Sequence, residues 1–189
     1  GYWQKGNHDL AIQDFDLAIK IDAKYAVAYD SRGKSYQSKR DYDRALDQMR
    51  RAVELNNSDP DAYAGLATAL LWSGDVDASV KAFETAGKLG LNFTVNESFV
   101  LGVAYLLADR SADATRTLER SLERNKTDLY TNAILAAAYA EAGRQANAVR
   151  QAATVRELDP RFDRADFGSL LRRPELRAKL AGALETHDF

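Results

Sequence analysis

The chain has 189 residues, of which 26 are lysine or arginine and 28 are aspartate or glutamate, so its formal charge is −2. This near balance argues against a nucleic-acid partner, because binding to nucleic acid requires a strongly basic face. The chain has no cysteine, which excludes disulfides, thiolate metal ligands and a thiol nucleophile. Its longest apolar runs, AYAGLATALLW and FVLGVAYLLA, are too short to span a bilayer, so we expect no membrane insertion.

Residues 1–25 are predicted to form a truncated helix pair, in which residues 1–5 supply only the end of a first helix. Tyr2 holds the place that Tyr36 holds 34 residues later, so the first helix should have begun further upstream. We therefore expect the chain to be a fragment of a longer protein, cut inside a repeat. A stub of one helical turn should fray, because so short a helix is not stable by itself.

Residues 26–59 are predicted to form two antiparallel helices. Their apolar and small side chains recur at spacings of three and four, which is the period of an amphipathic helix. The short polar segment KRDYD separates the two helical stretches, so the second helix should fold back on the first. Neither helix is apolar on all sides, and an isolated pair could not bury its faces, so further helices must pack against it.

The same pattern returns at residues 60–94, 95–128 and 129–162, with one extra residue between 90 and 94. Each repeat has a small position, a large position and an inter-helix turn, and the turn falls at Gly6, Arg40, Gly74, Asp109 and Gly143. This period of 34 residues, most clearly in RGKSYQSKRDYDRAL and YWQKGNHDLAIQDFDLAIKID, resembles the tetratricopeptide repeat. The resemblance implies an all-α fold, a right-handed superhelix (α-solenoid) of antiparallel helix pairs forming one solenoid domain.

The tail, residues 163–189, departs from this period. A short helix is expected over Arg164–Arg172, and Pro174 should begin a second helix with Leu176, Leu180 and Leu184 on one side. A solenoid needs a terminal helix that covers its last apolar edge, and the second helix is suited to be this helical cap. The ending LDPRF…FGSLLRRPELRAKLAGAL is also similar to the tetratricopeptide tails of bacterial class III nucleotide cyclases.

The resemblance implies that one face of each first helix lines the concave side of the superhelix. This face changes from polar in residues 26–59 to apolar in residues 95–128. A contiguous exposed apolar patch marks an interaction site, so we predict a groove that binds a peptide or helix of a partner protein. The predicted contact residues are Lys34, Gln37, Thr68, Leu71, Trp72, Phe99, Val103, Leu106, Tyr130 and Ile134.

Three alternatives to this groove stay open. The apolar residues could belong to the ordinary core, or the chain's own tail could cover them. The chain could also be a regulatory or dimerising module of a larger bacterial enzyme, in which the same patch binds a second copy or the catalytic domain. A clamp for a partner's C-terminal carboxylate is not expected, because only Lys34 could serve it and the equivalent positions are Thr68, Val103 and Ala137.

The sequence offers little for catalysis. Its two histidines, His8 and His187, have neither a serine–carboxylate arrangement nor the helical spacing of a metal site. Gly33 begins a Gly-Lys-Ser triplet like the end of a phosphate-binding loop, but the glycine required five positions earlier is Ala28, and the triplet lies inside a helix. We therefore expect no enzyme activity, cofactor or metal, and interpret Gly33 as a site of close helix packing.

Overall fold

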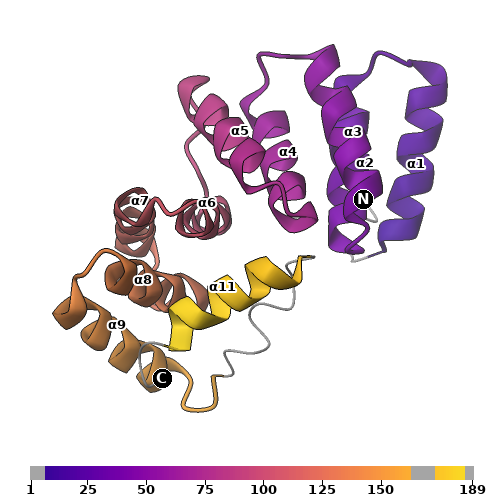
Figure 1. Ribbon diagram of the computed structural model, residues 1–189. Coiled ribbons are helices and arrows are strands. Elements are labelled where there is room, and N and C mark those ends of the chain that lie inside the picture. Colours follow the sequence, from indigo (N-terminus) through magenta and orange to yellow (C-terminus); the bar gives the residue numbers. More distant parts are fainter. Residues whose placement is uncertain (1–6, 163–172, 186–189) are drawn as a thin grey trace. The chain divides into compact units, whose positions relative to one another are not determined.

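The structure, a computed structural model, describes residues 7–162 and 173–185. Within these ranges it describes the side chains up to residue 183. These residues form ten α-helices and no strand (Figure 1). The helices are α1 (His8–Ile21), α2 (Ala26–Ser38), α3 (Tyr42–Leu55), α4 (Pro60–Ser73), α5 (Val76–Lys88), α6 (Val95–Leu107), α7 (Ser111–Arg124), α8 (Leu129–Glu141), α9 (Gln145–Leu158) and α11 (Pro174–Glu185). The expected stub at residues 1–5 and the expected helix at 164–172 lie outside the described residues.

Consecutive helices pack as antiparallel pairs, α2 with α3, α4 with α5, α6 with α7 and α8 with α9. The all-α, tetratricopeptide-like fold expected from the period is thereby confirmed. The chain divides into two compact units, unit 1 (Gly1–Asn92) and unit 2 (Phe93–Phe189). The boundary falls in the linker that carries the one extra residue, so a single continuous solenoid stays a prediction.

Glycines let the helices approach closely, as expected for Gly33. A methyl group added to Gly33 or Gly65 would lie within 2.8 Å or 2.7 Å of the Met49 side chain, which is fully buried in unit 1. In unit 2, a methyl group on Gly102 would lie 2.4 Å from a methyl carbon of Leu118, which is also fully buried. At both places a large buried side chain therefore lies directly against the backbone of a glycine.

The inter-helix turns fall at the predicted positions. Arg40, Gly74, Asp109 and Gly143 all adopt positive φ, of 58°, 100°, 60° and 71°. In three repeats an arginine just after the turn also stacks on the tyrosine at the end of the first helix. The guanidinium carbons of Arg44, Arg110 and Arg144 lie 4.7, 4.6 and 4.5 Å from the ring centres of Tyr36, Tyr105 and Tyr139. These cation–π contacts link the turn or the start of the second helix to the first helix in these three repeats.

The turn at Arg40 gives a testable prediction. A left-handed conformation costs a non-glycine residue roughly 1–2 kcal/mol, while glycine loses roughly 0.5–1 kcal/mol through the greater freedom of the unfolded chain. We therefore expect Arg40→Gly to raise the free energy of unfolding by about 1 kcal/mol in urea titrations. Gly143→Ala is the matched control and should lower it; a destabilised Arg40→Gly variant would contradict the reasoning.

Candidate functional site

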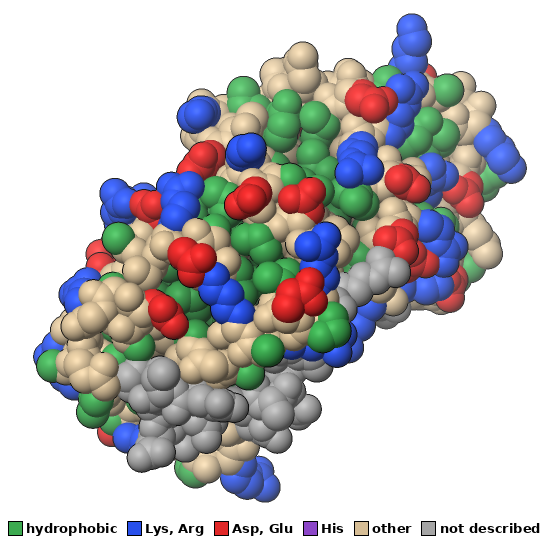
Figure 2. Space-filling model, viewed as in Figure 1, with side chains coloured by type: hydrophobic (Ala, Val, Ile, Leu, Met, Phe, Trp, Pro, Cys, Tyr) green, Lys and Arg blue, Asp and Glu red, His purple; other side chains and the backbone are tan. Residues whose placement is uncertain are grey.

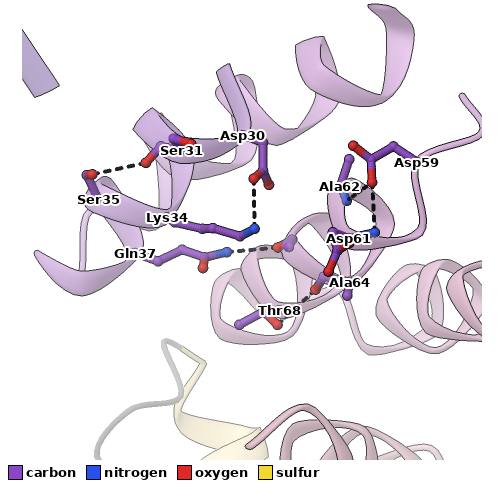
Figure 3. Close-up of polar contacts among 11 residues, drawn as sticks. Asp30, Ser31, Lys34, Ser35, Gln37, Asp59, Asp61, Ala62, Ala64 and Thr68 are labelled. Carbon is purple, nitrogen blue, oxygen red and sulfur yellow. Dashed lines mark hydrogen bonds and ion pairs between the residues drawn. The ribbon is translucent and has the colours of Figure 1, made fainter. Parts of the chain in front are cut away.

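The polar candidates of unit 1 lie on the facing sides of α2 and α4, and they make hydrogen bonds within the chain (Figure 3). Lys34 Nζ donates to Asp30 Oδ2 at 2.7 Å. Gln37 Nε2 donates across to the carbonyl oxygen of Gly65 at 2.8 Å, and Thr68 Oγ1 donates to the carbonyl oxygen of Ala64 at 2.9 Å. Lys34, Gln37 and Thr68 are half-buried, so this face presents polar groups that are already partly engaged.

The start of α4 sets the charge around this face. Asp59 is the N-cap of α4, and its Oδ1 accepts from the backbone N–H groups of Asp61 and Ala62 at 3.0 and 3.3 Å. Pro60 follows at the first turn, where its missing N–H costs nothing. Asp59 and Asp61 thus bring two carboxylates to the side of α4 that faces Asp30 (Figure 3).

Asp30 is the acid of this face whose pKa is raised by folding. Its residue surface is 9% exposed, and its Oδ1 has no hydrogen-bond partner among the described residues. Burial raises the pKa of Asp30, the neighbouring Lys34 ammonium partly offsets this, and the charges of Asp59 and Asp61 raise the pKa further. The carboxylate is therefore a source of pH-dependent stability in unit 1.

Because its pKa is raised by folding, Asp30 binds a proton more tightly in the folded chain than in the unfolded chain. Its ionised form therefore lowers stability above the raised pKa, and this penalty fades as the pH falls toward the unfolded value of about 3.9. We expect Asp30→Asn to raise the free energy of unfolding at pH 7, with a difference from wild type that shrinks toward pH 4. Urea unfolding across this range measures it, with Asp47→Asn as control, because Asp47 is exposed on α3 and does not contribute to the pKa shift of Asp30. A variant that is less stable at pH 7 would show that the Lys34 ion pair outweighs burial.

The apolar candidates of α4 are interior residues. Leu71 is fully buried and Trp72 is 9% exposed. The structure therefore places neither of them on an open surface, and their role as partner contacts stays a prediction.

In unit 2, the predicted apolar patch is buried rather than exposed. Val103, Leu106 and Ile134 are 1%, 4% and 0% exposed. The two helices that carry them, α6 and α8, pack against α7 and α9 and also contact α11, which Figure 1 shows alongside α8. A helix that is apolar on all sides is usually buried, which is the physical reason for this difference from the expected open patch.

Two aromatic candidates of the patch are brought together near the N-terminal ends of α6 and α8. The ring centres of Phe99 and Tyr130 lie 6.3 Å apart, and those of Tyr130 and Phe162 lie 6.5 Å apart, all in tilted arrangements. Tyr130 is 54% exposed, so part of this aromatic cluster faces solvent. Phe162 was not among the predicted contacts, although it closes the last 34-residue repeat.

The tail helix α11 is seated on this same pair of helices. It begins at Pro174 as predicted, and it buries Leu180 and Ala183, which are 2% and 5% exposed. Lys179 Nζ donates to the carbonyl oxygen of Leu107 at 2.9 Å and to Asp109 Oδ1 at 2.6 Å. No local pattern marked Lys179, because both of its partners lie about 70 positions earlier in the chain. Helix α11 therefore packs on α6 and α8, the two helices that carry Val103, Leu106 and Ile134. We call the side of these helices that carries the three residues the α6/α8 face.

Other kinds of site have little support among the described residues. No group of histidine, aspartate and glutamate side chains in that part of the chain could hold a metal ion. None of its helices combines the length and the apolar character needed to cross a bilayer. On the face shown in Figure 2, acidic and basic side chains are interspersed, so no basic field appears there.

Comparison with known proteins defines the class. Residues 2–25 and 37–92 both match sequence families described as tetratricopeptide repeat. The solved structure of YrrB, described as a TPR protein with an unusual peptide-binding site, is 25% identical with a TM-score of 0.70, over 90% of this chain and 89% of YrrB. Residues 2–25 and 37–92 are thus tetratricopeptide repeats, and the chain has a tetratricopeptide-like fold. It is a helical-repeat scaffold of the kind that serves protein–protein interaction.

Two curated fungal proteins are similar over about half of the chain. Protein bimA of Emericella nidulans is 29% identical over 83 residues, which cover 44% of this chain and 10% of bimA. The heat shock protein sti1 homolog of Schizosaccharomyces pombe is 30% identical over 90 residues, which cover 48% of this chain and 15% of that protein. The matched region thus spans only a small part of either relative. The likeness of the tail to cyclase tails stays a prediction, because none of these similarities concerns a nucleotide cyclase.

Proposed function

We propose that the chain binds a peptide or helix of a partner protein, and that the α6/α8 face of unit 2 is the main binding surface. One observation carries this proposal: α11 packs on α6 and α8, where it buries Leu180 and Ala183, and its Lys179 donates to the carbonyl oxygen of Leu107. Docking of an amphipathic helix into an apolar groove is a recurrent mode of peptide recognition. The peptide-binding site described for YrrB is in keeping with it.

The aromatic cluster supplies the accessible end of this surface. Phe99 and Tyr130 extend from the same two helices as Val103, Leu106 and Ile134. Tyrosine and phenylalanine bury a large area at little cost in conformational entropy, and they are frequent energetic hot spots of interfaces. We therefore assign the contacts with a partner to the aromatic pair first and to the apolar side chains of the α6/α8 face next.

A random peptide library displayed on phage and panned against the full chain tests the proposal. We expect Tyr130→Ala to weaken the selected peptides by about tenfold, the loss of a hot-spot side chain. Val149→Ala is the matched control, because Val149 is similarly exposed, at 51%, on the second helix of the same pair. Binding that is lost in Lys34→Glu but unchanged in Tyr130→Ala would move the site to unit 1 and overturn the assignment.

A further inference from the structure

We propose that α11 is a built-in competitor for the α6/α8 face, and that the partner of this face is an amphipathic helix with a basic side chain in the place of Lys179. This inference deepens the proposed function and rests on it. It names the chemistry of the partner and a way in which the chain regulates access to its own surface.

The C-terminal end of α6 favours the binding of a cation. Asp109 is the only acidic residue among the five positive-φ positions of the described residues, the others being Arg40, Gly74, Gly90 and Gly143. The end of a helix carries partial negative charge on its last carbonyl groups, so a carboxylate placed there is unfavourable unless a cation joins it. Lys179 supplies this cation by donating to the Leu107 carbonyl oxygen and to the Asp109 carboxylate.

Arg110, the basic residue next to Asp109 in the sequence, is engaged by other groups. The Arg110 guanidinium pairs with Asp113 at 2.7 Å and stacks on the ring of Tyr105. The cation of the site therefore comes from the docked helix rather than from the α6–α7 turn. The Asp109 side chain is 81% exposed, so an ion pair there adds more to specificity and register than to affinity.

Helix α11 buries few side chains against α6 and α8. Of its described side chains only Leu180 and Ala183 are buried, whereas Ala178 and most of the remainder face solvent. A terminal helix with so few buried contacts belongs to the least stable part of a fold and opens locally. In the resting chain α11 thus occupies its place on α6 and α8, and this place becomes free whenever α11 leaves.

A longer partner helix gains contacts that α11 does not use. From Leu107, beside the lysine, α6 extends about 12 Å along its axis to Phe99. A helix that places a basic residue against Asp109 and runs along α6 would reach Phe99 and Tyr130 as well. Such a partner must displace α11, whose attachment to the same chain gives it an effective concentration in the millimolar range.

The test uses a fluorescein-labelled peptide of residues 173–185, RPELRAKLAGALE, added to full-length chains and followed by anisotropy. In the Leu180→Asp chain the internal helix is released, so we expect the peptide to bind at least about tenfold more tightly than to wild type, as for removal of a tethered competitor. Ala178→Asp is the matched control, because it puts the same charge on the exposed side of α11. Its affinity for the peptide should equal that of wild type.

Charge exchange tests the basic anchor. A peptide carrying Lys179→Glu should bind the Leu180→Asp chain about fivefold more weakly, because an ion pair becomes a repulsion. Adding Asp109→Lys to that chain should restore its binding. If circular dichroism shows that Leu180→Asp loses more helix than α11 alone contains, the full-length Lys179→Glu chain is used in its place. That chain should admit the original peptide, and Asp109→Lys in the same chain should exclude it again.

Each contrary result has a distinct meaning. Equal binding of the peptide to wild type and to the released chain would overturn the competition while leaving a helix-binding face. Equal binding of the original and Lys179→Glu peptides would overturn the basic anchor. Failure of the peptide to bind any chain would overturn the role of α11 as a ligand, and the proposed function would then be decided by the phage-selected peptides and Tyr130→Ala.

Discussion

Replacing Leu118 by alanine is expected to lower the free energy of unfolding by about 2–5 kcal/mol, the range for a large core side chain truncated to alanine. Leu118 is fully buried, and its methyl carbons lie directly against the backbone at Gly102. Removing them leaves a cavity between α6 and α7 that rigid helix backbones cannot fill. Urea unfolding followed by far-UV circular dichroism measures the loss.

The reciprocal change at Gly102 sharpens this prediction. Gly102→Ala alone should be destabilising by about 1–3 kcal/mol, because its new methyl group would lie 2.4 Å from Leu118. In the double variant the alanine methyl enters the space vacated by the leucine, so the combined loss should be smaller than the sum of the two single losses. Strict additivity would show that the two side chains do not meet, because independent sites add.

Leu106→Ala should have the second large effect. The sequence alone predicts that this change weakens partner binding more than folding, since Leu106 was expected on an open groove. At 4% exposure the residue is interior in the structure, so we expect a loss of about 2–5 kcal/mol in the free energy of unfolding. Leu158→Ala, on a side chain that is 37% exposed at the end of α9, is the matched control and should cost much less.

A second variant separates coverage by α11 from ordinary packing inside the repeats. If α11 buries Leu106, the cost of Leu106→Ala should largely disappear in a Leu180→Asp chain, because the contact is already lost there. An unchanged cost in both chains would assign Leu106 to the packing of α6 against α7 and α8. The same pair of measurements thus decides whether Leu106 is available to a partner when α11 leaves.

Residues within one repeat were predictable because their signals are local. The spacing of apolar side chains along each helix and the turn residues between helices lie within 34 positions of one another, and both follow directly from helix geometry. The four turn positions therefore fell where the period placed them. Gly33 was likewise recognised as a packing position, since the small position of each hairpin is specified by the hairpin itself.

The burial of the α6/α8 face could be predicted from the sequence only in part. The runs FVLGVAYLLA and AILAAAYA are apolar on nearly every side, which indicates that something covers them, and the tail was one of the alternatives. Nothing in these runs indicates which segment does so. Likewise, the raised pKa of Asp30 depends on how α4 brings Asp59 and Asp61 toward α2, which the sequence does not state.

The sequence by itself determined the family, the helix pairs and their turns, because each of these depends on side chains that are neighbours along one helix or one hairpin. The tertiary structure alone decided that Val103, Leu106 and Ile134 are covered and that Lys179 meets Asp109. The burial depends on how separate helices assemble, and the ion pair depends on a contact between residues 70 positions apart. Both are governed by the shape and charge of assembled surfaces rather than by any local period.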